Sequence, residues 1–152
     1  MAQILVLLTS ETEAMAIEEI LQEDFDVTLC SDPIEAAMNL QRDYDAMILD
    51  LFLPGDDGLT FLAQSRNHCP SVIILLSQLI CSDVLTQAKA IGVNVLIRKP
   101  YDISVIRKHL VRLLAKKNPS RVNGRGMESQ EDTPVWTTQK STPELRINED
   151  QE

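Results

Sequence analysis

Asp50 is the residue that its sequence surroundings best mark for chemistry, because it ends an apolar run typical of a buried strand. The run Ala46-Met47-Ile48-Leu49 has the composition of a strand covered on both faces, and Leu53-Pro54-Gly55-Asp56-Asp57-Gly58 behind it favours a turn. Three other polar groups follow apolar runs: Thr9, Ser77 and Lys99. Ligands of parallel sheets gather at the carboxyl ends of the strands, so a carboxylate, two hydroxyl groups and an ammonium group should meet at one edge.

The elements that position these groups alternate regularly along the chain. Short apolar runs predict five strands, at Ile4 to Leu8, Phe25 to Cys30, Ala46 to Leu51, Val72 to Leu76 and Val95 to Arg98. Amphipathic spacing predicts helices at Glu11 to Gln22, Pro33 to about Arg42, Leu59 to about Asn67, Ser82 to Ile91 and from Asp102 to Leu114. Strands alternating with helices specify an α/β fold with a doubly wound parallel sheet.

Charge and composition divide the chain into a domain, residues 1–116, and a flexible polar linker or tail, residues 117–152. The net charge is −9, and residues 1 to 115 hold 16 acidic against 8 basic side chains. An acidic domain of this kind is not expected to bind nucleic acid directly, because phosphate neutralisation needs clustered Lys and Arg. The chain has neither a membrane-spanning apolar run nor a leader pattern, which predicts a cytoplasmic protein. The three cysteines Cys30, Cys69 and Cys81 are odd in number and far apart, and they are expected to be reduced and mostly packing residues.

Three motifs in order make residues 2 to 116 resemble the receiver domain of bacterial response regulators. They are Met47-Ile48-Leu49-Asp50 with the turn behind it, Ser77 after its strand, and Lys99-Pro100-Tyr101. The resemblance implies a flavodoxin-like or CheY-like sheet with strand order 2-1-3-4-5 and five helices. It also implies a signalling module of a two-component phosphorelay rather than an enzyme, with a histidine kinase or phosphotransfer protein as partner. The face of the fourth helix, fifth strand and fifth helix would bind partners or form a homodimer.

The same resemblance gives roles to the polar groups at the sheet edge. Asp50 would be the phosphoacceptor, a carboxylate that attacks phosphohistidine and becomes an acyl phosphate. Lys99 would pair with a phosphoryl oxygen, and Ser77 would turn its hydroxyl toward another. The Lys99-Pro100 bond is expected to be cis.

The chain departs from the receiver pattern at two places. Receivers ordinarily hold Mg²⁺ with an acidic pair after the first strand, and Leu8 and Thr9 stand at those positions. Asp50 and the Phe52 carbonyl remain as metal ligands, with Glu11 as a less favoured addition, so Mg²⁺ binding should be weak. Leu96 stands where an aromatic switch residue is usual. We therefore expect an atypical receiver, phosphorylated weakly or not at all, whose free Asp50 forms an ion pair with Lys99.

Two other functions stay open at this point. One is a normally phosphorylated receiver of a DNA-binding transcriptional regulator, for example of the sporulation type, with an output domain beyond residue 152. The remote one is a small flavodoxin-like enzyme on the same sheet. The segment Thr9 to Thr12 is not expected to bind a flavin phosphate, because it lacks glycine and carries Glu11.

Several polar residues are expected to have plain structural roles. Asp56 and Asp57 are interpreted as turn residues in preference to metal ligands. His68 and His109 are expected to lie in solvent, on helix ends or exposed faces, because neither has a partner at metal-ligand spacing.

Overall fold

A parallel five-stranded sheet forms the centre of the computed structural model, which describes residues 1–117. Its strands are β1 (Ala2–Leu7), β2 (Phe25–Cys30), β3 (Ala46–Asp50), β6 (Val72–Ser77) and β7 (Val95–Arg98). Their order across the sheet is β2-β1-β3-β6-β7. Counted along the chain, these strands have the order 2-1-3-4-5, so the predicted doubly wound fold is confirmed.

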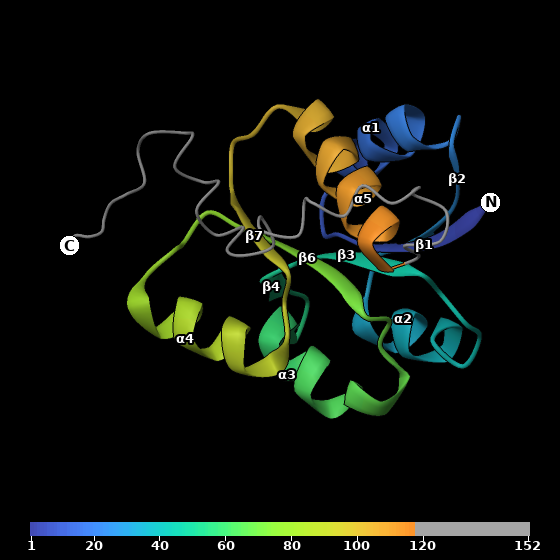
Figure 1. Cartoon of the computed structure of the whole chain (residues 1–152). Helices are drawn as coiled ribbons and strands as arrows, with labels where there is room; N and C mark the ends of the chain where they lie inside the picture. Colours follow the sequence, from blue (N-terminus) through green and yellow to red (C-terminus); the bar gives the residue numbers. More distant parts are fainter. Residues whose placement is uncertain (118–152) are drawn as a thin grey trace.

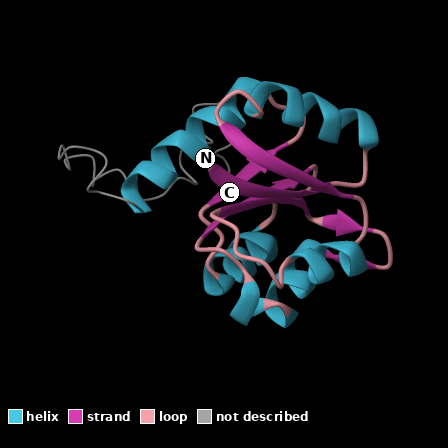
Figure 2. Ribbon diagram, turned by 90° about the vertical axis from the view of Figure 1, so that its right-hand side faces the viewer, coloured by secondary structure: helices cyan, strands magenta, loops and turns pink. Residues whose placement is uncertain are grey.

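Helices cover both faces of this sheet (Figure 1). Helices α1 (Glu11–Leu21) and α5 (Ile103–Lys117) lie on one face, and α2 (Pro33–Asn39), α3 (Gly58–Gln64) and α4 (Ser82–Ile91) lie on the other. Figure 2 shows the same layers edge-on, with the strands between two sets of helices. A short 3₁₀ helix, η1 (Arg66–His68), follows α3.

Alternation along the strands divides the core into two parts. Ile4 and Val6 of β1 pack with the α1 and α5 side, while Leu5 and Leu7 pack with the α2, α3 and α4 side. Every residue of β3 is buried. This double coverage explains the continuous apolar run before Asp50, because a central parallel strand has no solvent-facing side.

The turn after Asp50 contains a small hairpin that the sequence did not predict. Strands β4 (Phe52–Leu53) and β5 (Asp56–Asp57) pair antiparallel, and Gly55 between them has a φ of 74°. The interpretation of Asp57 as a structural residue agrees with its contacts, because its carboxylate caps α3 by accepting from the Thr60 N–H at 2.8 Å. A Cβ on Gly58 would lie 2.5 Å from the backbone oxygen of Asp50, so only glycine lets α3 begin this close to β3.

One expectation about a single residue needs correction. His109 is buried, with 8% of its surface exposed, because it shares the inner part of α5 with Ile106 and Leu110; His68 is exposed as expected. Of the cysteines, Cys30 is buried, Cys69 is partly buried and Cys81 is exposed at the start of α4.

Some element ends also differ from the prediction, since α2 ends at Asn39 rather than near Arg42 and α3 ends at Gln64. The tail predicted from residue 117 onward falls outside the described residues, apart from the end of α5. None of the helices described is long and apolar enough to cross a membrane.

Candidate functional site

Asp50 lies at the carboxyl end of β3 with 3% of its surface exposed, and each oxygen of its carboxylate contacts another residue. Oδ2 accepts hydrogen bonds from the Thr9 backbone N–H at 2.9 Å and from the Thr9 hydroxyl at 3.0 Å. Oδ1 forms an ion pair with Lys99 Nζ at 2.6 Å and has no hydrogen bond besides this contact. The parallel register of β1 and β3 brings Thr9 to this place from the loop after β1.

Lys99 reaches the site from the loop after β7. Its peptide bond to Pro100 is cis, as expected, and its backbone N–H donates to the Ser77 carbonyl at 2.9 Å. The expected ion pair between Lys99 and Asp50 is present. Burial lowers the pKa of the Lys99 ammonium, but hydrogen bonds and charges of Asp50 and Glu13 outweigh that effect, so the pKa is raised above its ordinary value.

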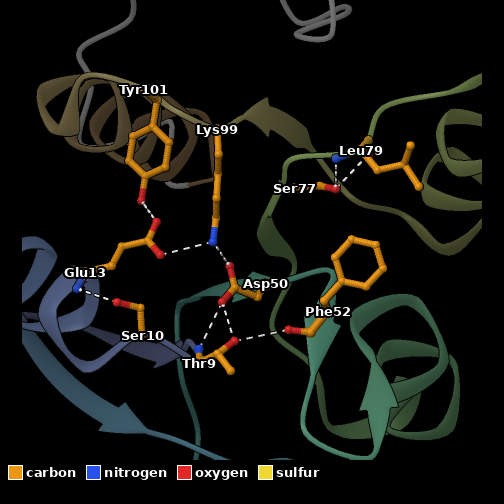
Figure 3. A network of polar contacts seen from close by, with 9 residues as sticks. All are labelled: Thr9, Ser10, Glu13, Asp50, Phe52, Ser77, Leu79, Lys99 and Tyr101. Carbon is orange, nitrogen blue, oxygen red and sulfur yellow. Dashed lines mark hydrogen bonds and ion pairs between the residues drawn. The ribbon is translucent and has the colours of Figure 1, made fainter.

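Glu13 is a member of the site that the sequence analysis missed. Its Oε1 lies 3.0 Å from Lys99 Nζ, and its Oε2 accepts a hydrogen bond from the Tyr101 hydroxyl. Figure 3 shows Glu13 and Asp50 approaching the Lys99 ammonium from different sides. Burial, followed by the hydrogen bond and the charge of Glu13, raises the pKa of Tyr101 above its ordinary value, so the phenol is protonated and donates.

The local sequence around Glu13 favours a different role for this residue, that of a helix cap. Ser10-Glu11-Thr12-Glu13 has the form of a capping box, in which the glutamate would reach back to the cap residue. The Ser10 hydroxyl does cap α1 by accepting from the Glu13 N–H at 3.2 Å. The Glu13 carboxylate turns instead to Lys99 and Tyr101, which lie more than eighty residues later in the chain.

The Thr9 hydroxyl also faces the Phe52 carbonyl, at 3.2 Å. Its one proton can be donated to Asp50 Oδ2 or to this carbonyl, which places Thr9 Oγ1 between the two oxygens that the family resemblance names as metal ligands. Glu11 is exposed. Among residues 1–117, no group of three His, Cys, Asp or Glu side chains is arranged to hold a metal ion.

Ser77 ends β6 and is buried, but its hydroxyl is turned to its own loop. It donates to the Leu79 carbonyl at 2.7 Å and accepts from the Leu79 N–H at 2.9 Å. The structure therefore brings Thr9, Asp50 and Lys99 into direct contact and does not bring the Ser77 hydroxyl to them (Figure 3). Leu96, at the expected switch position, is buried in the core on the α2, α3 and α4 side.

Residues 4–111 match the family model described as the response regulator receiver domain. The chain belongs to this family. Receivers act in two-component signal transduction, and proteins of the family interact with histidine kinases or phosphotransfer proteins.

Curated relatives of this receiver carry different names and are longer. A protein-glutamate methylesterase/protein-glutamine glutaminase of Bradyrhizobium diazoefficiens is 33% identical over 104 residues, which are 64% of this chain and 29% of that protein. The transcriptional regulatory protein KdpE of Staphylococcus aureus is 30% identical over 87 residues, which are 57% of this chain and 38% of KdpE. The receiver thus spans well under half the length of either relative.

Solved structures give the same fold. The chemotaxis protein CheY4 of Vibrio cholerae aligns with a TM-score of 0.68 at 24% identity, over 74% of this chain and 98% of CheY4. A receiver domain from Francisella aligns with a TM-score of 0.69 at 24% identity, over 78% of this chain and 99% of that domain. At these identities the likeness concerns the fold alone.

Proposed function

We propose that this receiver regulates a partner or a downstream output by protein-protein contact, and that Mg²⁺-dependent phosphorylation of Asp50 is weak or absent. The position of the Thr9 hydroxyl between Asp50 Oδ2 and the Phe52 carbonyl carries the proposal. The module is not an enzyme in its own right. Its partner is a histidine kinase or phosphotransfer protein, and the face formed by α4, β7 and α5 is available for pairing with a second copy.

The oxygen atoms around Asp50 do not fit Mg²⁺ well. This ion prefers octahedral oxygen coordination and usually takes one or two carboxylates beside the phosphate groups. Leu8 and Thr9 supply no carboxylate, and Leu8 is buried. Asp50 Oδ1 is paired with Lys99, while Oδ2 and the Phe52 carbonyl face the Thr9 hydroxyl. A metal would have to displace that hydroxyl and would gain only one carboxylate.

Weak metal binding limits phosphorylation because of charge. Phosphorylation replaces the single negative charge of the Asp50 carboxylate by a phosphoryl group that carries about 1.5 to 2 negative charges. Lys99 is the cation in contact with Asp50, and it is shared with the Glu13 carboxylate. Without a metal, the transferred group would therefore be poorly compensated.

Acetyl phosphate with Mg²⁺, followed by intact-mass measurement, tests the proposal. Wild-type protein is expected to gain less than about one tenth of a phosphoryl group per chain, whereas Thr9→Asp, which restores one acid, should increase phosphorylation at least about tenfold. Thr12→Asp is the matched control, since Thr12 is exposed on α1 and receives the same charge. Stoichiometric, Mg²⁺-dependent phosphorylation of wild-type Asp50 would contradict the proposal.

A normally phosphorylated receiver attached to a transcriptional output is the second candidate. It is favoured by the names of two relatives, the transcriptional regulatory proteins KdpE and GlnL, the latter from Bacillus subtilis and 28% identical over 83 residues. The same mass measurement separates the candidates, because this one requires stoichiometric phosphorylation of wild-type protein.

A further inference from the structure

The ammonium of Lys99 holds two carboxylates at once. Nζ lies 2.6 Å from Asp50 Oδ1 and 3.0 Å from Glu13 Oε1. Both partners are largely shielded from water, with 4% of the Asp50 side chain and 19% of the Glu13 side chain exposed. An ammonium has three N–H donors, so these two contacts occupy two of the three donors of Lys99.

Glu13 is fixed from its other end as well. The Tyr101 hydroxyl donates to Oε2, and the backbone of Glu13 is held in the first turn of α1 by the Ser10 cap. Glu13 is thus held at both ends, its backbone by the cap of α1 and its carboxylate by Lys99 and Tyr101 (Figure 3). Such preorganisation reduces the entropy lost in keeping a long side chain in one place.

We propose that Glu13 is an internal anion that takes, at Lys99, the place of the phosphoryl group. The inference deepens the proposed function and rests on it, since it names the residue that keeps the site in one state without phosphate. Asp50, Glu13 and Lys99 together carry one net negative charge. Phosphorylation would turn the Asp50 carboxylate into an acyl phosphate, which raises the net negative charge by up to about one, and the phosphoryl group would compete with Glu13 for Lys99.

Glu13 is therefore a positioning residue that sets anion occupancy at Lys99. Its removal should open Lys99 to an external anion even where no metal and no phosphoryl transfer is involved. Glu11→Gln is the matched control: it removes the same charge two residues away, from a side chain that is exposed.

Inorganic phosphate tests the inference directly in protein carrying Asp50→Asn, which removes the competing charge at the acceptor position. Thermal unfolding is measured in rising phosphate against chloride of equal ionic strength. In the Asp50→Asn, Glu13→Gln protein, phosphate at about ten times its Kd should raise Tm by about 5 °C, and the rise should saturate. The Asp50→Asn, Glu11→Gln protein should show no saturable rise. Equal responses in the two proteins would overturn the inference.

Phosphorylation supplies a second test should the doubly substituted protein fail to fold. In the reaction with acetyl phosphate, an Asp50 carboxylate oxygen bonds to phosphorus, the bond from phosphorus to the acetyl oxygen breaks, and acetate leaves with the electron pair. With Thr9→Asp as background and Mg²⁺ present, Glu13→Gln should raise the initial rate at least about fivefold over Glu19→Gln, which removes the same charge from an exposed side chain of α1 that is not a candidate metal ligand. Equal rates would overturn the inference.

The inference and the proposed function fail in different ways. Stoichiometric phosphorylation of wild-type protein refutes the proposed function, whereas the comparison of Glu13→Gln with its control variant decides the place of Glu13 in either case.

Discussion

Lys99→Met is expected to destabilise the domain strongly, because it removes the ammonium while keeping the apolar stem of the side chain. Asp50 Oδ1 would then be left in a site where only 4% of the Asp50 side chain is exposed, with no other partner. Glu13 would lose the same cation.

The size of the effect follows from burial. Removing one partner of a buried ion pair costs about 3–5 kcal/mol. Because 21% of the Lys99 side chain is exposed and water can reach the vacated position, we expect about 2–4 kcal/mol for Lys99→Met. Asp50→Asn removes the charge that needs the cation. The free energy lost in the double variant Lys99→Met, Asp50→Asn should therefore be smaller than the sum of the losses in the two single variants, by about 1.5–3 kcal/mol.

Urea unfolding followed by circular dichroism, analysed as a double-mutant cycle, measures these free energies. Lys108→Met is the control, since Lys108 is exposed on α5 and its substitution should change the free energy of unfolding by less than about 0.5 kcal/mol. If Lys99→Met were no more harmful than Lys108→Met, or if the cycle showed no coupling with Asp50, the account of the site as a buried ion pair would be wrong.

Two further substitutions probe parts of the fold around the site. Burial, together with the charge of Arg112, lowers the pKa of His109 to about 4, so folded protein keeps this histidine neutral and the stability it contributes is lost as pH falls from about 6.5 toward 4. Between pH 7 and pH 4.5, the free energy of unfolding in urea should therefore fall by about 1–2 kcal/mol more for wild type than for His109→Gln. Equal losses in the two proteins would contradict this account of His109. Gly58→Ala should lower the free energy of unfolding by about 2–4 kcal/mol, because the added Cβ would clash with the Asp50 backbone. Gly55→Ala should lower it by about 1 kcal/mol, since only the positive φ of Gly55 disfavours alanine there. Similar losses for the two variants in urea unfolding would refute this difference.

The sequence was sufficient to predict those parts of the fold that depend on local patterns. Buried apolar runs predicted the five main strands, and Asp32 before Pro33 predicted the start of α2, where its carboxylate accepts from the Glu35 N–H at 2.9 Å. Hairpin β4–β5 escaped prediction because each of its strands has only two residues, too few to show alternation.

The candidate site was predictable only in part, for a physical reason. Asp50 and Lys99 each end an apolar run, so the rule for parallel sheets places both at one edge. Glu13 carries no such mark, because its local pattern favours a capping box and its partners Lys99 and Tyr101 come from the far end of the chain. The exposure of His109 was predicted wrongly because the buried face of the helix was inferred from apolar residues alone. A histidine next to Ile106 on that face was therefore not counted as buried.

The Ser77 hydroxyl forms its hydrogen bonds with Leu79, so the side-chain contacts of the site extend to only one side of the sheet. The side-chain contacts of Asp50 lead through Thr9 to the loop before α1, and through Lys99 and Glu13 to α1 itself and to Tyr101 before α5. The end of β6 and the loop into α4 share no side-chain hydrogen bond with this path among the described residues. Through its side-chain contacts, a partner that displaces Asp50 would therefore first move groups of α1 and of the loop before α5, and a surface that reports on this site should be sought there.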